Sequence, residues 1–377
     1  MCAYVMPKRV LGSGVLIAAI RPLFSTALLT LLLFCTPSLA AAFTAQQLGD
    51  YGNVSVMEVT GNFDAHLPDG TTNAEPRRVI AKEFYKTHKD EYDFLIIFTD
   101  FDFLMPDAET AAFYVGIKND VQGIGSALFD YSSSYGSAGR LQGTVDMGTL
   151  ADNASDPTAP QFENTLDTLN HELLHRWGAR VKYQDTAGKM STALIGKDGS
   201  HWSFLLDTKG SLEYGNRWQD NGDGTFTSIE ARKYFSPLDL YLMGMVDAGA
   251  VPPMLLIENP QIDPTKISEV GAIISGVART VTIEDIIAAE GPRIPSAADS
   301  QKSFKAAFIY ATSPGTFNGK DLRAIENIRN GFLTRYSILT DGESLVQVAV
   351  APRDDLPTNP GITPPPLHSP FSVTLSG

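Results

Sequence analysis

The amino-acid sequence predicts an α+β fold, with β-strands in the first half of the chain and a mostly helical half after them. The first observation is a buried strand over 93–99, where bulky and β-branched residues form the short run DFLIIFT. Shorter strand patterns follow at 113–117 and 141–150. The second observation is an amphipathic helix over 165–178. The third is a set of helical patterns further along, at 236–244, 281–289 and 320–334.

The first 40 residues have the features of an export leader. Its only charged residues are basic: Lys8, Arg9 and Arg21. An apolar run covers 24–34, and the small-x-small pattern that signal peptidase cleaves ends at Ala40. We therefore expect a signal peptide over 1–40 and a secreted or periplasmic protein without stable membrane insertion after cleavage. Retention of the leader as an anchor is the alternative.

Composition excludes several classes of function. Both cysteines, Cys2 and Cys35, lie in the leader, so the mature chain would have no disulfide and no cysteine-ligated zinc site. The chain of 377 residues has a net charge of −14, with 29 basic and 43 acidic residues. Because the leader contains basic residues and no acidic ones, the remainder is more acidic still. Nucleic acid is therefore excluded as a partner.

The rest of the chain divides into three parts. Residues 41–75 form an N-terminal lead-in or a short propeptide, which would have no cysteine to block a metal. One large domain covers 76–351 and begins with a helix that starts at Pro76 and buries Ile80 and Phe84. From 352 to 377 the chain is proline-rich, as in a stalk or a disordered tail.

The helix over 165–178 carries the strongest chemical motif, HELLH. His171 and His175 are four residues apart, so on a helix both imidazoles can bind one metal ion. Glu172 can accept a proton from the water that such a metal activates. At about 100° per residue the two histidines lie opposite the apolar face, so that face can pack on a core. Gly178 is placed to end the helix.

A catalytic zinc needs three protein ligands and one open position. Val181, three residues after Gly178, cannot bind a metal, so the third ligand must lie further along the chain. The candidates are His201, Glu213, Glu230 and Asp239.

Asp239 is the favoured third ligand. It lies in SPLDLYLMG, a short helix that begins after Ser236, and a second helix can donate a carboxylate to the metal. The competing interpretation is that Ser236 and Asp239 form a capping box with the S-x-x-D spacing. His201 is then the alternative ligand or a donor that stabilises the oxyanion, and Tyr241 and Tyr214 are further candidates for that donor.

The segment after the motif is rich in tryptophan and turn residues. Trp177, Trp202 and Trp218 are the three tryptophans of the chain, and their bulk predicts a pocket wall or a small core. The sequence DNGDG at 220–224 resembles half of a calcium loop but lacks the terminal bidentate acid. Its Asn-Gly and Asp-Gly pairs favour a hairpin, and Ca²⁺ is the lesser expectation.

These residues together resemble a known family. HELLHRWG, the pair His201-Trp202, the stretch NRWQDNGDGTF and SPLDLYLMG look like an HExxH zincin metallopeptidase. The likeness is to a gluzincin-like, secreted bacterial type with an LYLMG segment, and it covers about 92–245. It implies a zincin-like fold: a twisted mixed sheet with an edge strand above the HExxH helix. The strand at 141–150 is where we expect that edge strand, which would pair with an extended substrate.

The resemblance also implies an activity. Zn²⁺ would be held by His171, His175 and Asp239, with Glu172 as general base and His201 and Tyr241 as supporting catalytic residues. The expected function is zinc-dependent hydrolysis of peptide bonds in a protein or peptide substrate. The alternative is a surface or binding protein that keeps the zincin fold without turnover.

Overall fold

The computed structural model describes residues 42–108, 110–196, 199–231, 233–259, 261–266 and 268–351. The chain divides into two units, Met1–Ala40 and Ala41–Gly377, and the described residues belong to the second. The expected signal peptide and proline-rich tail lie outside the described residues. Among the residues that are described, no helix has both the length and the apolar character needed to cross a membrane.

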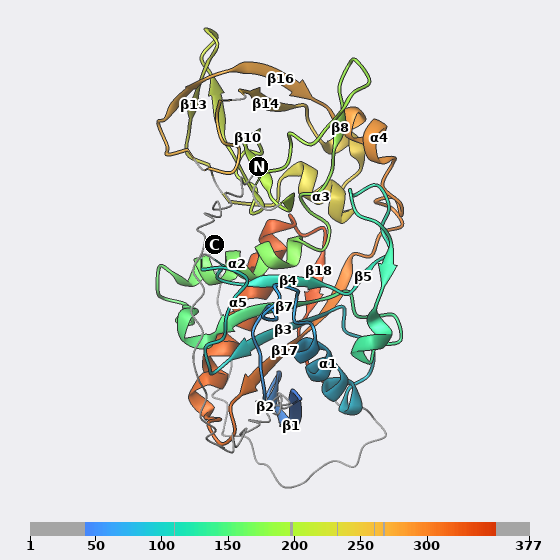
Figure 1. The fold of residues 1–377 in the computed structure, drawn as a ribbon, viewed down its shortest axis with the longest axis vertical. Coiled ribbons are helices and arrows are strands. Elements are labelled where there is room, and N and C mark those ends of the chain that lie inside the picture. The colour runs from blue at the N-terminus through green and yellow to red at the C-terminus, as the bar shows by residue number, and fades with distance from the viewer. Residues whose placement is uncertain are drawn as a thin grey trace, which may run out of the picture. The chain divides into compact units, whose positions relative to one another are not determined.

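A seven-stranded mixed sheet organises the described chain (Figure 1). Its order is β1-β2-β17-β3-β7-β4, and β18 also pairs with β17. The central strands β2, β17, β3 and β7 are parallel, whereas β1 and β4 run antiparallel at the two edges. The bounds are β1 (Thr44–Tyr51), β2 (Val54–Thr60), β3 (Phe94–Thr99), β4 (Phe113–Gly116), β7 (Gly143–Thr149), β17 (Ser303–Thr312) and β18 (Leu345–Gln347).

Helices cover both faces of this sheet. The side chains of β3 point alternately to either side and are apolar on both, so each face can pack against a helix. Leu95 and Ile97 pack in one core with α1 (Glu75–Thr87). Phe94 and Ile96 pack in the other core, which includes the apolar faces of α2 (Phe162–Leu174) and α5 (Gly319–Leu339). All six side chains of β3 are essentially inaccessible to solvent. Helix α2 is thus anchored on the sheet through its leucines.

A second region, built largely from short strands, lies between α2 and β17 in the sequence. Its two larger sheets have the orders β11-β10-β14-β16 and β12-β13-β15. The strand bounds are β8 (Tyr183–Gln184), β9 (Met190–Ser191), β10 (Trp202–Asp207), β11 (Tyr214–Asn216), β12 (Trp218–Asp220), β13 (Thr225–Ser228), β14 (Met254–Glu258), β15 (Ile273–Ser275) and β16 (Val277–Val281). Among its described residues the α-helices are α3 (Pro237–Met243) and α4 (Ile283–Glu290), and β8 pairs with β9. Strands β5 (Lys118–Asn119) and β6 (Phe129–Asp130), which precede α2 in the sequence, form another two-stranded sheet.

Local sequence signals predicted several elements correctly. The strand expected at 93–99 is β3, and α1 has a proline in its first turn. Helix α3 begins after Ser236 and ends before Gly244, which has a positive φ of 80°. Helix α4 is capped by Thr282 in a capping box.

The prediction of a mostly helical second half is wrong. The described residues from 202 onward contain strands β10 to β18 as well as α3, α4 and α5. The strand WSFLLD over 202–207 is a short apolar run, and periodicity alone does not distinguish such a run from a buried helix. Residues 41–75, expected as a separate lead-in or propeptide, instead provide β1 and β2, and β2 pairs with the central strand β17.

The prediction that the strand at 141–150 is the edge strand is also wrong. Strand β7, which corresponds to the pattern at 141–150, is buried along its whole length and lies between β3 and β4. Its polar residues are compatible with burial because Asp146 pairs with the buried guanidinium of Arg77, 2.9 Å away. The edge strand is β4, which contacts α2.

Candidate metal centre

Helix α2 places His171 and Glu172 in its last turn, and His175 is its C-cap. The helix ends at Leu174, earlier than Gly178, because its final turn tightens: the N–H of Trp177 donates to Leu174 O at 2.9 Å. Trp177 is buried and makes an edge contact with Phe304. The apolar face predicted from the sequence therefore anchors the helix, and the histidine face borders a cleft.

Two further side chains join this face because of the pairing between β10 and β11. These strands are parallel, with Trp202 opposite Tyr214. The N–H of Trp202 donates to Glu213 O at 2.8 Å. His201 and Glu213 each immediately precede a strand of this pair, so the register brings them side by side.

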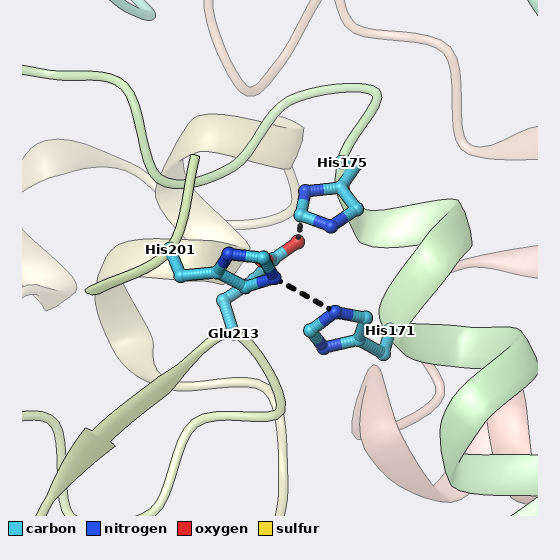
Figure 2. A group of neighbouring side chains, drawn as sticks. All are labelled: His171, His175, His201 and Glu213. Atoms are coloured by element: carbon cyan, nitrogen blue, oxygen red, sulfur yellow. Dashed lines mark hydrogen bonds and ion pairs between the residues drawn. The ribbon is translucent and has the colours of Figure 1, made fainter. Parts of the chain in front are cut away.

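His171, His175, His201 and Glu213 form one cluster, which we call the metal cluster (Figure 2). Each offers a ligand atom, and these atoms all lie within 4.8 Å of one another. His171 Nε2 and His201 Nε2 are 3.1 Å apart. His171 Nδ1 is 2.6 Å from Leu212 O. Because a carbonyl oxygen only accepts, Nδ1 carries the hydrogen and Nε2 keeps a lone pair directed at the cluster.

Glu172 lies beside the histidines rather than among the grouped ligands. Its Oε1 is 3.9 Å from His171 Nε2, and its Oε2 is 3.9 Å from His175 Nε2. Burial, with a smaller contribution from the charge of Asp146, raises the pKa of Glu172 to about 8. A hydrogen bond from the backbone N–H of Tyr114 on β4 acts in the opposite direction. The carboxylate is therefore held between the edge strand and the metal cluster.

The environment of Glu213 fits a bound cation. Its side chain is fully buried, and neither carboxylate oxygen has a hydrogen-bond partner among the described residues. Burial raises the pKa of Glu213 well above its ordinary value, and the charges of Asp239 and Glu172 add to this effect. Burial also lowers the pKa of His175 well below its ordinary value, so its ring is neutral and can bind a metal.

Among the described residues, no lysine or arginine forms an ion pair with Glu172 or Glu213; the ionisable side chains beside them are those of His171 and His175. An isolated buried carboxylate is costly, and a divalent cation removes that cost. Imidazole nitrogens with a carboxylate suit Zn²⁺ and other first-row transition metals. The residues present therefore fit a metal ion.

Asp239, which the sequence favoured as the third metal ligand, does not lie in the metal cluster. Its Oδ1 accepts a hydrogen bond from Trp202 Nε1 at 2.9 Å, and its Oδ2 accepts from Ser211 Oγ at 2.6 Å. Oδ2 also accepts from the N–H of Ser236 at 2.7 Å, which completes the capping box of α3. With both oxygens engaged, Asp239 lies outside the metal cluster, and the capping interpretation describes it.

Other sequence candidates also lie elsewhere. The hydroxyl of Tyr241 accepts from the N–H of Arg293 at 3.2 Å, and Tyr241 does not line the cleft. Glu230 is exposed and outside the metal cluster. Residues 220–224 form the turn of the β12–β13 hairpin, where Asp223 Oδ1 accepts from the N–H of Thr225 at 3.0 Å. The hairpin that the sequence favoured here is therefore confirmed. Among the described residues, no metal-binding group of His, Cys, Asp or Glu includes this turn.

Of the two tyrosines considered as oxyanion donors, it is Tyr214 that lies beside the metal cluster. Its ring stacks on His201 with centroids 4.6 Å apart, and it lines the cleft. Its φ is 70°, a conformation that non-glycine residues adopt rarely and that often marks a functional site. In the sequence, the feature that links Tyr214 to the site is its position directly after Glu213.

The cleft in front of the cluster has a volume of about 510 Å³ and is bordered by α2, β4 and the segment that carries His201 and Tyr214. A second cavity of about 510 Å³ shares lining residues with it, including Thr110 and Asn164. The two cavities are therefore neighbours beside α2, and the first of them borders the edge strand β4.

A scan against models of protein families, a search of curated proteins and a search of solved structures each found no match for this chain. What the site can do therefore follows from its geometry.

Proposed function

We propose that this chain is a zinc-dependent endopeptidase that acts outside the cytoplasm on protein or peptide substrates. One observation carries the proposal: His171, His175 and His201 converge, with Glu172 placed 3.9 Å from the Nε2 atoms of the first two. Three imidazole nitrogens are a known ligand set for catalytic zinc. An adjacent carboxylate is the group that hydrolysis by an activated water requires. The alternative of a zincin-like binding protein leaves Glu172 without such a role.

The side chains then have distinct tasks. Bound zinc would supply a water of lowered pKa and would polarise the scissile carbonyl. Glu172 would act as the general base toward that water and would return the proton to the leaving amine, because its carboxylate faces the side of the cluster where both Nε2 atoms lie. Tyr214, stacked on His201 at the cleft wall, is placed to donate a hydrogen bond to the oxyanion.

Strand β4 is the expected contact for the substrate backbone. It is at the end of the sheet order, and Phe113 and Tyr114 line the cleft. An extended peptide can add to such an edge through main-chain hydrogen bonds. The backbone of Tyr114 also lowers the pKa of Glu172, so the edge strand lies beside the general base.

The test uses the purified full-length protein and a diverse set of unfolded protein and peptide substrates. We expect cleavage that a chelator abolishes and that added Zn²⁺ restores. Glu172→Gln should bind zinc normally but lose turnover, because an amide does not accept the proton. Glu163→Gln is the matched control on the exposed first turn of α2 and should retain activity. Full cleavage by Glu172→Gln would contradict the proposed mechanism; zinc binding without cleavage of any substrate by the wild-type protein would favour the binding-protein alternative.

A further inference from the structure

We propose that Glu213 is a fourth protein ligand of the same ion, which makes the site His₃Glu. The inference rests on the metal-binding part of the proposed function and not on peptidase activity. It changes the expected coordination, because three histidines alone would leave the fourth position of a tetrahedral zinc for water.

The first argument is the state of the carboxylate. Both oxygens of Glu213 and Nδ1 of His175 are buried and have no hydrogen-bond partner among the described residues. Oε1 is 3.2 Å from that Nδ1, close enough for a hydrogen bond in distance, but the orientation does not make one. A carboxylate that only positioned His175 would be expected to accept a hydrogen bond from it. The carboxylate is instead available to a cation in the metal cluster.

The second argument is that the backbone holds this side chain in place. The N–H of Glu213 donates to Ser211 Oγ at 3.0 Å. On the opposite side, a Cβ added to Gly178 would lie 3.3 Å from both Cγ and Oε1 of Glu213. The absence of a side chain at Gly178 therefore leaves space for the carboxylate of Glu213, and the turn after α2 packs against that carboxylate.

The third argument concerns geometry at the ion. His171 Nε2 and His201 Nε2 are 3.1 Å apart. Nitrogens this close together can both reach one zinc ion at about 2.05 Å. With four protein ligands and one water, we expect a five-coordinate ion.

The test measures Co²⁺ binding to the metal-free protein by titration and by visible absorption. Glu213→Gln keeps the side-chain shape and an oxygen acceptor for His175 but loses the anionic ligand. We expect Co²⁺ affinity to fall more than about a hundredfold, beyond the roughly ten- to hundredfold typical of a group that only orients a ligand. The weak bands of five-coordinate Co²⁺ should be replaced by the stronger bands of four-coordinate Co²⁺.

Two further variants complete the experiment. Glu230→Gln makes the same chemical change at an exposed site in the same region and should leave both affinity and spectrum unchanged. Gly178→Ala keeps Glu213 but forces its carboxylate to shift by a few tenths of an ångström, so it should weaken Co²⁺ binding even if Glu213→Gln folds poorly.

Wild-type affinity and spectrum in Glu213→Gln would overturn the inference. If His201→Gln lost Co²⁺ under the same conditions, the three-histidine metal site would still stand. Failure of the wild-type protein to bind Co²⁺ or Zn²⁺ would instead overturn the metal site itself. The two failures are therefore distinguishable.

Discussion

Asp239→Asn tests whether Asp239 is part of the scaffold or a metal ligand. The carboxylate is fully buried between α3 and the two segments that lead to the metal cluster. It accepts hydrogen bonds from Trp202, which follows His201, and from Ser211, which binds the N–H of Glu213. It therefore connects both segments that deliver the third and fourth members of the cluster.

The expected loss of stability follows from these contacts. An asparagine keeps the oxygen that accepts from Trp202 Nε1, but its amide group does not accept from Ser211 Oγ or from the N–H of Ser236. Both of those residues are buried. A buried donor left without an acceptor costs about 1–3 kcal/mol, so two such donors cost about 2–6 kcal/mol. We expect a decrease of about 4 kcal/mol in the free energy of unfolding, a large part of the roughly 5–15 kcal/mol typical of a folded protein.

The assay is urea unfolding of the chelator-treated protein, because a contribution from the scaffold is present without metal. Asp223→Asn is the control: this residue is in an exposed turn that asparagine supports equally well, so we expect a change within about 0.5 kcal/mol. The reasoning is refuted if Asp239→Asn leaves the metal-free protein as stable as wild type but removes the extra stability conferred by Zn²⁺. That result would identify Asp239 as a ligand.

Three other predictions concern the site and its support. Tyr214→Phe should lower kcat about 10²–10³-fold if its hydroxyl stabilises the oxyanion, with Zn²⁺ affinity retained; steady-state kinetics and a zinc titration check this, and an equal loss of zinc would show that the ring assembles the site instead. Trp177→Ala should cost about 3–5 kcal/mol in urea unfolding, because the indole is buried against Phe94 and Phe304; a cost below about 1 kcal/mol would contradict that packing. Ca²⁺ added to the zinc-loaded protein should leave the melting temperature unchanged, because the DNGDG turn over 220–224 is an exposed hairpin; a rise that Asp223→Asn abolishes would restore the calcium interpretation.

The elements that were predicted correctly depend on residues close together in the sequence. Buried runs, capping residues and a leucine face act within one or two turns or a single strand, as at β3 and at the caps of α3 and α4. The same locality explains how HELLH indicated two histidines and a carboxylate on one face of α2. Strand β7 was misjudged because the family resemblance was used to place an edge strand there. Its burial depends on a distant partner, Arg77, which pairs with Asp146.

The second half of the site depends on contacts that no local pattern contains. His201 and Glu213 are neighbours because β10 and β11 pair in a parallel register, and that register depends on hydrogen bonds among distant residues. Asp239 had the S-x-x-D spacing of a capping box and also the chemistry of a ligand. Only the positions of Trp202 and Ser211 around it decide between the two roles.

The most direct test of the metal centre is a crystal structure of the zinc-loaded protein with anomalous diffraction data at the zinc absorption edge. We predict one strong anomalous peak in the metal cluster, about 2.0–2.1 Å from a ring nitrogen of each of His171, His175 and His201. A carboxylate oxygen of Glu213 should lie about 2.0–2.2 Å from the same peak. A zinc-loaded crystal whose anomalous peak lay away from these histidines, or that had none, would contradict the proposed metal centre.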